Sequence, residues 1–329
     1  MFQVKMKKPF DIVIEESGTP IPGNGEALIA VKANGICGSD MHRYTGHSPI
    51  SNPYNAIGHE YGGIIERIEG EGKGLEPCMK VAVNPNSWCG TCYYCRQSME
   101  NLCENMTGFN GMAEKVSVPF KNIVKLDPSF DLVLSPFIEP TACAIHAVGE
   151  ITSSNVLVIG TGTMGLIEQQ ILRSNGNNVI TIDMQDHALE LSRRMGADLA
   201  IDFKDSYKEE KLKNYLSHKK IDIVIDNVCS DETVDLAVKA VKKSGTVLIM
   251  GVCAKNLTMD YLSVLLKEVV ISTNFLFRHK DFVKASELIS GGHIDVRPLI
   301  AKIYPLKKAG EAFDYKFNSP SAVKVILET

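Results

Sequence analysis

The distribution of apolar and polar positions changes character near residue 153. Before that point the apolar runs are short and are separated by turns that contain glycine and proline, as around 26–32 and 61–68. Such runs predict strands that pair with near neighbours into an antiparallel barrel. After that point apolar runs alternate with stretches of helical periodicity, which predicts an α/β fold with a doubly wound parallel sheet.

Most predicted elements lie in the second part of the chain. A length of 329 residues exceeds the roughly 250 at which single cores stop growing, so we expect two domains. The stretch 111–125 is strand-like as well. The other predicted strands are 155–160, 178–183, 199–202, 221–226, 245–251, 268–273 and 322–327, and the predicted helices are 141–148, 166–174, 188–196, 206–217, 231–243 and 280–290.

Three glycines follow the first strand of the second part. Gly160, Gly162 and Gly165 have the spacing G-x-G-x-x-G, and Asp183 ends the next predicted strand. With a strand before and a helix after, this spacing is typical of a dinucleotide site, where the pyrophosphate lies on the helix N-terminus. Asp183 can accept hydrogen bonds from both ribose hydroxyls and repels a 2′-phosphate, which favours NAD over NADP.

Four cysteines lie close together in the first part of the chain. Cys89, Cys92 and Cys95 are spaced by two residues, and Cys103 follows after seven more. Four thiolates can enclose one zinc ion completely, which predicts a structural site with no position left for substrate. Chance clustering and an iron–sulfur cluster are the less favoured alternatives.

A second group of metal-ligand types precedes this cluster. Cys37 lies in Gly-Ile-Cys-Gly-Ser-Asp-Met-His, and His59 and Glu60 lie in Gly-His-Glu. Three protein ligands leave the fourth zinc position open, which is the pattern of a catalytic site. The alternative is that Cys37 and His59 are unrelated core and surface residues. Glu139 opens a predicted helix, where capping and metal binding are equally favoured.

Composition narrows the class of protein. An apolar fraction of 44% and a charged fraction of 22% are those of a globular chain. A net charge of -4 gives no basic field, so we expect no nucleic-acid partner. The sequence contains no apolar run of about 20 residues and no signal peptide, so we expect no membrane association and a cytoplasmic protein. The remaining cysteines, Cys78, Cys143, Cys229 and Cys253, are expected to be small buried hydrophobes.

Taken together, these motifs resemble the zinc-dependent medium-chain dehydrogenases, in particular the sorbitol (polyol), sugar-acid and threonine dehydrogenase branch. The resemblance covers nearly the whole chain. It implies a discontinuous GroES-like catalytic domain at 1–148, with the structural zinc lobe at 86–104, and a Rossmann NAD-binding domain at 149–275. Residues 276–329 would then return to the catalytic domain.

The same resemblance implies roles for individual residues. Cys37, His59 and Glu60 would bind the catalytic zinc, and Glu139 would do so directly or through water. Asp40 would orient His59. The other implied roles are proton exit through Ser39 and His42, structural zinc binding by Cys89, Cys92, Cys95 and Cys103, NAD binding by Gly160, Gly162, Thr163, Met164, Gly165 and Asp183, and a backbone near the nicotinamide at Val252 and Cys253.

The implied reaction is transfer of a hydride from a secondary alcohol of a polyol, sugar or sugar acid to NAD. Arg278, in Phe-Leu-Phe-Arg, and Arg43 are candidates for substrate binding, with a surface ion pair or a coenzyme contact as the alternative for Arg278. Threonine dehydrogenase, a simple alcohol dehydrogenase and a non-catalytic NAD-binding relative stay open, although no zinc ligand is missing. Family precedent implies a homodimer or homotetramer. Short connections at 71–81 and 111–136 depart from the family pattern and leave the substrate open.

Overall fold

The computed structural model describes residues 1–48, 57–72, 74–217, 219–253 and 255–329. The chain divides into two compact units, one formed by Met1–Cys143 with Phe277–Thr329 and the other by Ala144–Leu276. The division falls inside helix α3 (Ile138–Val148), which begins three residues before the predicted helix 141–148. Each unit has its own sheet.

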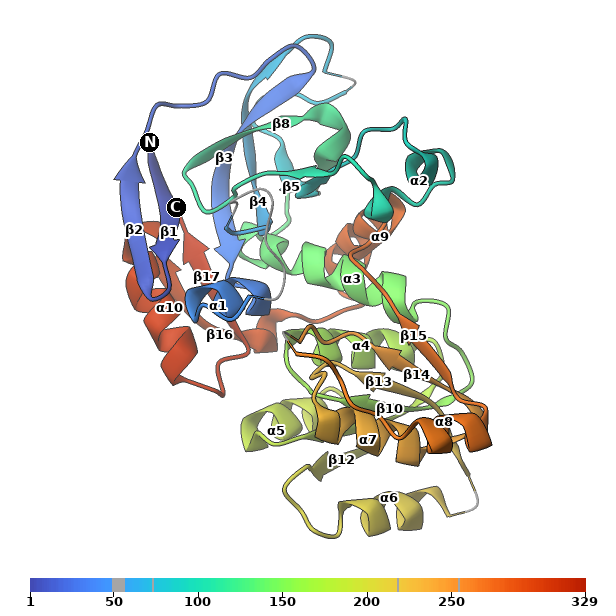
Figure 1. Cartoon of the computed structure of the whole chain (residues 1–329). Helices are drawn as coiled ribbons and strands as arrows, with labels where there is room; N and C mark the ends of the chain where they lie inside the picture. The colour runs from blue at the N-terminus through green and yellow to red at the C-terminus, as the bar shows by residue number, and fades with distance from the viewer. Residues whose placement is uncertain (49–56, 73, 218, 254) are drawn as a thin grey trace. The chain divides into compact units, whose positions relative to one another are not determined.

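The unit of Ala144–Leu276 is built on a six-stranded parallel sheet, as the alternating pattern predicts. The strand order is β12-β11-β10-β13-β14-β15, so the direction of winding reverses between β10 and β13. In Figure 1 these two strands lie between α4 and α7. The strands are β10 (Asn155–Ile159), β11 (Asn178–Asp183), β12 (Leu199–Asp202), β13 (Ile221–Asp226), β14 (Val241–Ile249) and β15 (Val270–Thr273), and the helices are α4 (Thr163–Ser174), α5 (Asp186–Arg194), α6 (Lys208–Leu216), α7 (Asp231–Ala240) and α8 (Tyr261–Lys267).

Burial explains why this sheet could be predicted. Val156, Leu157, Val158 and Ile159 in β10 are at most 1% exposed, because both faces of a central parallel strand are covered. The result is a continuous apolar run that is easily recognised in a sequence. Helix α8 was not predicted, since none of its residues is buried and its apolar side chains therefore show no helical period.

The other unit contains a seven-stranded sheet. Its order is β16-β17-β3-β4-β5-β9, with β8 paired to β3. The strands of this unit are β1 (Phe2–Lys8), β2 (Asp11–Glu16), β3 (Glu26–Gly35), β4 (Glu60–Glu69), β5 (Lys80–Val83), β6 (Asn86–Ser87), β7 (Thr107–Gly108), β8 (Lys115–Pro119), β9 (Ile123–Lys125), β16 (Ile300–Pro305) and β17 (Lys324–Glu328). Its helices are α1 (Gly38–Tyr44), α2 (Tyr93–Arg96), α9 (His279–Ser290) and α10 (Ala309–Asn318), and its 3-10 helices are Glu100–Leu102, Phe120–Asn122, Leu132–Phe137, Arg297–Leu299 and Leu306–Lys308.

The sheet differs from the antiparallel barrel expected from local pairing. Strands β16 and β17 are parallel and are joined through α10, and β17 then pairs antiparallel with β3. Figure 1 shows these first and last parts of the chain side by side. A parallel pair needs such a helical crossover, which reasoning about neighbouring strands does not include. Ile326 of the C-terminal strand therefore lies opposite Gly35, two residues before Cys37.

No helix in the described ranges of the chain is long and apolar enough to cross a bilayer.

Candidate functional site

The four predicted lobe cysteines converge on one point. Their sulfur atoms all lie within 4.8 Å of one another. Cys89 Sγ is 3.9 Å from Cys95 Sγ, and Cys92 Sγ is 3.9 Å from Cys103 Sγ. Zinc–sulfur bonds of about 2.3 Å in a tetrahedron place sulfurs roughly 3.8 Å apart, so the group fits one zinc ion. A cluster of several irons is larger and would spread the sulfurs further.

Electrostatics at this lobe also suit a cation. Backbone and hydroxyl hydrogen bonds from Thr91 lower the pKa of Cys89 to about 5, which makes this thiol anionic at neutral pH. Burial instead raises the pKa of Cys95 to about 12. Four thiolates this close cannot all be charged without a cation between them, and a bound metal removes that repulsion.

Cys37, His59 and Glu60 form a second group. One ligand atom from each lies within 4.8 Å of the other two. Cys37 is the N-cap of α1, and Glu60 begins β4, which pairs with β3 so that Glu60 lies opposite Gly35. Burial lowers the pKa of His59, but Cys37, Asp40 and Glu139 together outweigh burial, and the pKa lies well above the ordinary value. One sulfur, one nitrogen and one oxygen donor suit a zinc ion with one open position.

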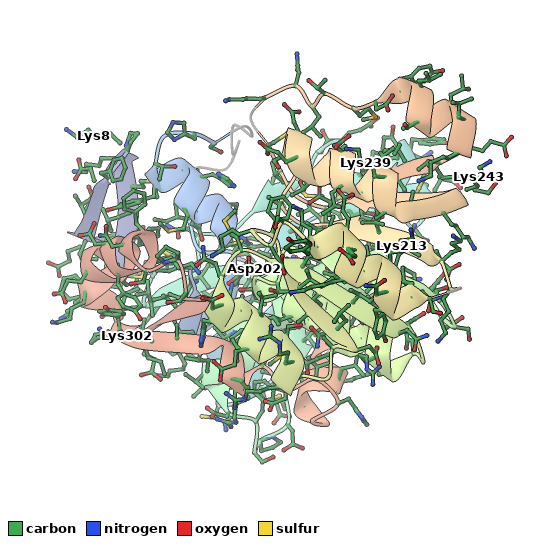
Figure 2. The ribbon with its side chains drawn as sticks, turned by 90° about the horizontal axis from the view of Figure 1, so that it is seen from below. Lys8, Asp202, Lys213, Lys239, Lys243 and Lys302 are labelled. Atoms are coloured by element: carbon green, nitrogen blue, oxygen red, sulfur yellow. The ribbon has the colours of Figure 1, made fainter. Side chains whose placement is uncertain are left out.

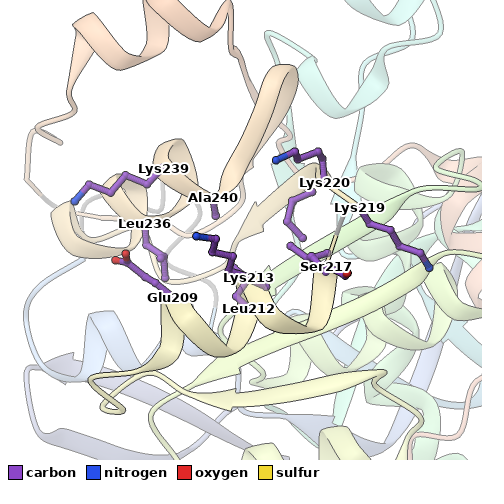
Figure 3. A pocket seen from close by; sticks show the side chains of 11 residues that line it. Glu209, Leu212, Lys213, Ser217, Lys219, Lys220, Leu236, Lys239 and Ala240 are labelled. Carbon is purple, nitrogen blue, oxygen red and sulfur yellow. The ribbon is translucent and has the colours of Figure 1, made fainter.

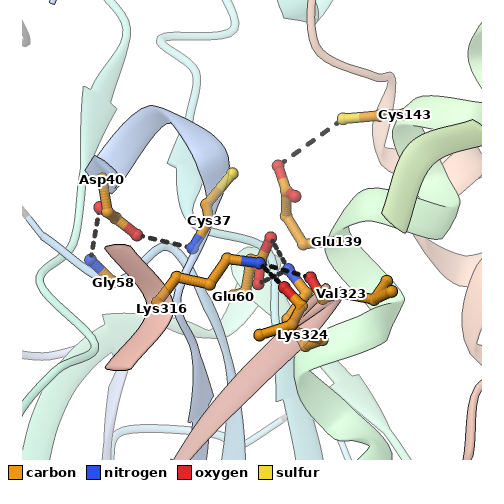
Figure 4. Close-up of polar contacts among 10 residues, drawn as sticks. Cys37, Asp40, Gly58, Glu60, Glu139, Cys143, Lys316, Val323 and Lys324 are labelled. Carbon is orange, nitrogen blue, oxygen red and sulfur yellow. Dashed lines mark hydrogen bonds and ion pairs between the residues drawn. The ribbon is translucent and has the colours of Figure 1, made fainter. Parts of the chain in front are cut away.

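Asp40 holds the two ligand segments together. Its Oδ2 accepts a hydrogen bond from the backbone N–H of Cys37 at 3.0 Å, and its Oδ1 accepts one from the N–H of Gly58 at 3.4 Å (Figure 4). The carboxyl group is 2% exposed and also acts electrostatically on His59. Asp40 therefore links the backbone at Cys37 to the backbone directly before His59, and its role in orienting the His59 side chain stays a prediction.

A buried lysine at this site was missed by the sequence reasoning. Lys324 Nζ donates to both carboxylate oxygens of Glu60, at 2.6 and 2.7 Å, and the two side chains are 3% and 1% exposed. Lys316 lies beside this pair and donates to the carbonyl oxygens of Ala322 and Val323 (Figure 4). The available signal was a lysine at the start of the apolar run 325–327, where a charge needs a partner.

Glu139 and Cys143 lie one turn apart on α3. The thiol of Cys143 donates to Glu139 Oε1 at 3.7 Å. Burial raises the pKa of Glu139 to about 7, against the opposing effect of His59. Glu139 is therefore close enough to interact electrostatically with His59. The carboxylate grouped with Cys37 and His59 is nevertheless that of Glu60. Cys143 is half-buried at this site rather than a plain core residue.

The residues predicted for proton exit and substrate lie on α1 and before α9. Ser39 and His42 are exposed and three residues apart, so they share a face of α1. Arg43 is half-buried on the same helix. Arg278 is the N-cap of α9, and its backbone N–H donates to Asp281 Oδ2 at 2.9 Å. Its Nε is buried without a hydrogen-bond partner among the described residues.

The glycine turn has the geometry that its spacing predicts. Gly160 has a φ of +87°, which favours glycine, and a Cβ on Gly165 would lie 2.1 Å from the carbonyl oxygen of Gly160. Gly162 is the N-cap of α4, and a Cβ there would meet nothing within 4 Å. Thr163 and Met164 form the first turn of α4. Open space at this helix N-terminus suits a pyrophosphate.

Asp183 faces this turn. Its Oδ2 accepts hydrogen bonds from the N–H and hydroxyl of Thr161 at 2.6 and 3.0 Å, and its Oδ1 accepts one from the N–H of Gln185 at 2.8 Å. Each carboxylate oxygen has two lone pairs, so Oδ2 is fully used and one lone pair on Oδ1 remains for a ribose hydroxyl. Val252 is 48% exposed after β14, and the thiol of Cys253 donates to the carbonyl of Lys255 at 3.2 Å.

A pocket of about 250 Å³ lies elsewhere in this unit, between α6 and α7. Its lining combines apolar residues such as Leu212 and Leu236 with Lys213, Lys220 and Lys239. Figure 2 shows Lys213 and Lys239 on these two helices, and Figure 3 shows the pocket from close by. It includes none of the predicted coenzyme residues, so it is separate from the glycine turn.

The chain joins a parallel sheet of the nucleotide-binding type to a β unit that contains two cysteine-containing ligand groups. This combination is that of the metal-dependent dehydrogenases. Comparison with known proteins agrees. Residues 23–128 match the alcohol dehydrogenase GroES-like domain, and residues 163–291 match the zinc-binding dehydrogenase family. The chain belongs to the zinc-dependent medium-chain dehydrogenases, as the motifs predicted, and it is similar to relatives named L-idonate 5-dehydrogenase, L-threonine 3-dehydrogenase and sorbitol dehydrogenase.

Three relatives cover nearly all of the chain. An NAD-dependent alcohol dehydrogenase from Saccharolobus solfataricus is 30% identical, over 98% of this chain and 98% of that protein. L-Idonate 5-dehydrogenase from Vitis vinifera is 29% identical, over 94% of this chain and 89% of that protein. The crystal structure of a short chain alcohol dehydrogenase from E. coli CFT073, complexed with NADH, is 30% identical with a TM-score of 0.89, over 100% of this chain and 99% of that one.

Proposed function

We propose that this protein is an NAD-dependent zinc dehydrogenase that oxidises a secondary alcohol of a polyol, sugar or sugar acid. The observation that carries the proposal is the convergence of Cys37, His59 and Glu60 within 4.8 Å. When bound there, zinc supplies Lewis-acid polarisation of the substrate oxygen, and NAD accepts the hydride. The relatives named L-idonate 5-dehydrogenase and NAD-dependent alcohol dehydrogenase support this class of reaction.

The chain's own residues have defined tasks in this proposal. Cys37, His59 and Glu60 hold the catalytic metal, with Glu139 as the alternative carboxylate. Asp40 fixes the two ligand segments through the hydrogen bonds to their backbone. The hydroxyl of Ser39 and the imidazole of His42 pass the substrate proton toward solvent, for which their exposure on one helix face is suitable.

The substrate class follows from Arg278 and Arg43. A guanidinium has several donors in a planar fork, which suits vicinal hydroxyls or a carboxylate. The buried Nε of Arg278 has no partner among the described residues and so has donor capacity for a ligand. Replacement of Arg278 by Ala should raise KM for a hexonate or polyol but barely change it for a small secondary alcohol. Equal losses for both substrates would assign this residue to the coenzyme or the scaffold.

Three further points stay proposals. The catalytic domain comprises 1–148 and 276–329 and the NAD domain 149–275, which the compact units 1–143 with 277–329 and 144–276 support. The protein is cytoplasmic, in keeping with nine free cysteines. It is a homo-oligomer, supported by large exposed side chains on α8 and by β15 at the sheet edge.

The decisive experiment combines metal analysis with a substrate panel. We expect two zinc ions per chain and NADH formation with polyols or hexonates, in preference to threonine or ethanol. Cys37→Ala should abolish turnover while the protein stays folded and keeps one zinc ion. Turnover of threonine alone would establish threonine dehydrogenase, and NADH binding without turnover of any alcohol would identify a non-catalytic relative.

A further inference from the structure

Glu168, on the second turn of α4, has no role in the proposed chemistry. Its side chain is fully buried. Oε2 accepts a hydrogen bond from Nδ2 of Asn227 at 2.6 Å, and Oε1 is buried without a partner among the residues that the structure describes. Burial raises the pKa of this carboxyl to about 7. Burial of a carboxyl group costs folding free energy unless the group is hydrogen-bonded, and Asn227 supplies a hydrogen bond here.

Asn227 begins the loop that follows β13, and this loop is packed between two glycine turns. A Cβ on Gly160 would lie 2.8 Å from Cγ2 of Val228 and 3.4 Å from Cβ of Asn227. On the other side, a Cβ on Gly251 would lie 2.7 Å from the carbonyl carbon of Val228. The turns after β10, β13 and β14 therefore touch in series, in the order of their strands in the sheet.

The middle turn is fixed at its first residue, Asn227, by two hydrogen bonds. Its backbone N–H at Asn227 donates to the carbonyl of Ile159, directly before the glycine turn, at 2.9 Å. Its side-chain amide is held from α4 by Glu168, which lies three residues after Gly165 and so on the same helix face. These turns lie at the carboxyl ends of strands beside the switch point, where α/β sheets bind nucleotides.

We propose that Glu168 is a positioning residue for the coenzyme, because its bond to Asn227 holds the middle turn and thereby fixes the spacing of the two glycine turns. This inference rests on the proposed function, since it assumes that NAD binds at these turns. Without the bond, the amide of the half-buried Asn227 loses its acceptor, and the turn populates other arrangements. Apparent affinity then falls by the fraction of chains in the competent arrangement.

Three variants of the full-length zinc-loaded protein test this role. Glu168→Gln keeps an acceptor of the same size for Asn227, whereas Glu168→Leu removes it. Gln169→Leu is the matched control, because Gln169 is equally buried on the same helix but bonds to Ser192, with Nε2 2.8 Å from its carbonyl and Oε1 2.7 Å from its hydroxyl. The dissociation constant for NADH is measured by fluorescence titration, together with KM for NAD and for the alcohol.

We expect Glu168→Leu to raise the NADH dissociation constant and KM for NAD roughly three- to tenfold, with KM for the alcohol unchanged. Glu168→Gln should stay within about twofold of the wild type, and Gln169→Leu should lose thermal stability without that loss of affinity. Wild-type affinity in Glu168→Leu, or an equal loss in the Gln169→Leu control, would overturn the assignment.

Two outcomes separate this inference from the function on which it rests. If the wild-type protein does not bind NADH, the proposed function fails, and the positioning role fails with it. If Glu168→Leu does not fold, Asn227→Ala breaks the same hydrogen bond from the loop, and unchanged NADH binding in that variant would overturn the role of Glu168 alone.

Discussion

Lys324→Met is the substitution for which the structure makes the sharpest quantitative prediction. The ammonium group lies 2.6 and 2.7 Å from the two oxygens of Glu60, and both side chains are at most 3% exposed. Removal of one partner from a buried ion pair costs about 3–5 kcal/mol, because the remaining charge has no water to solvate it. We expect Lys324→Met to lose that much of the free energy of unfolding in the metal-free protein.

Glu60→Met and the double variant show how much of this loss is due to the unpaired charge. Glu60→Met should cost less than Lys324→Met, because Cys37 and Glu139 also act on Lys324 and keep it partly compensated. The double variant should return to within about 1–2 kcal/mol of the wild type, since an apolar pair of similar volume often replaces a buried ion pair without loss. The coupling energy of this cycle therefore measures the pair itself.

Urea unfolding followed by circular dichroism, with and without zinc, measures all four proteins. Zinc should restore part of the stability of Lys324→Met, because the bound cation replaces the missing ammonium beside Glu60. A loss below about 1 kcal/mol in metal-free Lys324→Met would show that water reaches this pair, and it would refute the reasoning.

Other predictions concern the lobe, the coenzyme, assembly and pH. Cys95→Ser should lower the melting temperature and the zinc content together, since a closed metal site contributes folding free energy; full zinc retention would argue against the lobe assignment. Asp183→Ser combined with Met184→Arg should shift preference toward NADP, and equal use of both coenzymes by the wild type would contradict our view of this acid. Leu266→Glu should shift sedimentation toward the monomer if the exposed face of α8 is an interface, and an unchanged profile would exclude it. Burial raises the pKa of Glu168 to about 7 from 4.5, so the stability that the protonated carboxyl contributes below pH 4.5 is lost as the pH rises to 7. Glu168→Gln should therefore be more stable than the wild type by ~3 kcal/mol at pH 8, with no gain at pH 4.5. Urea titrations at the two pH values measure this difference.

Local patterns account for the parts of the molecule that could be predicted. The strand 199–202 and the glycine turn were predicted because each is specified by a few consecutive residues. An apolar run indicates the strand, and the spacing of the glycines indicates the turn. Cys89 to Cys103 are similarly close in the chain. Helix α10 and strand β16 were not predicted, and they determine the parallel pairing at the sheet edge.

Contacts between distant residues account for what could not be predicted. Lys324 and Glu60 are separated by 264 positions, and no periodicity links a lysine near one end of the chain to a carboxylate near the other. Asn227 and Glu168 are likewise 59 positions apart. Cys143 looked like an ordinary buried thiol, because only the tertiary structure shows that it donates to Glu139.

The placement of Lys324 on the last strand has a consequence for biosynthesis. Glu60 emerges from the ribosome 264 residues before its cation. At elongation rates of about 5–20 residues per second, this separation corresponds to roughly 13–50 s during which the carboxylate has no partner from the C-terminal strand. The nascent catalytic unit cannot pair β17 with β3 until β17 has emerged, although Ala144–Leu276 can already fold by then. Chaperones and proteases would therefore encounter an intermediate in which the coenzyme-type sheet is complete and the metal centre is still open.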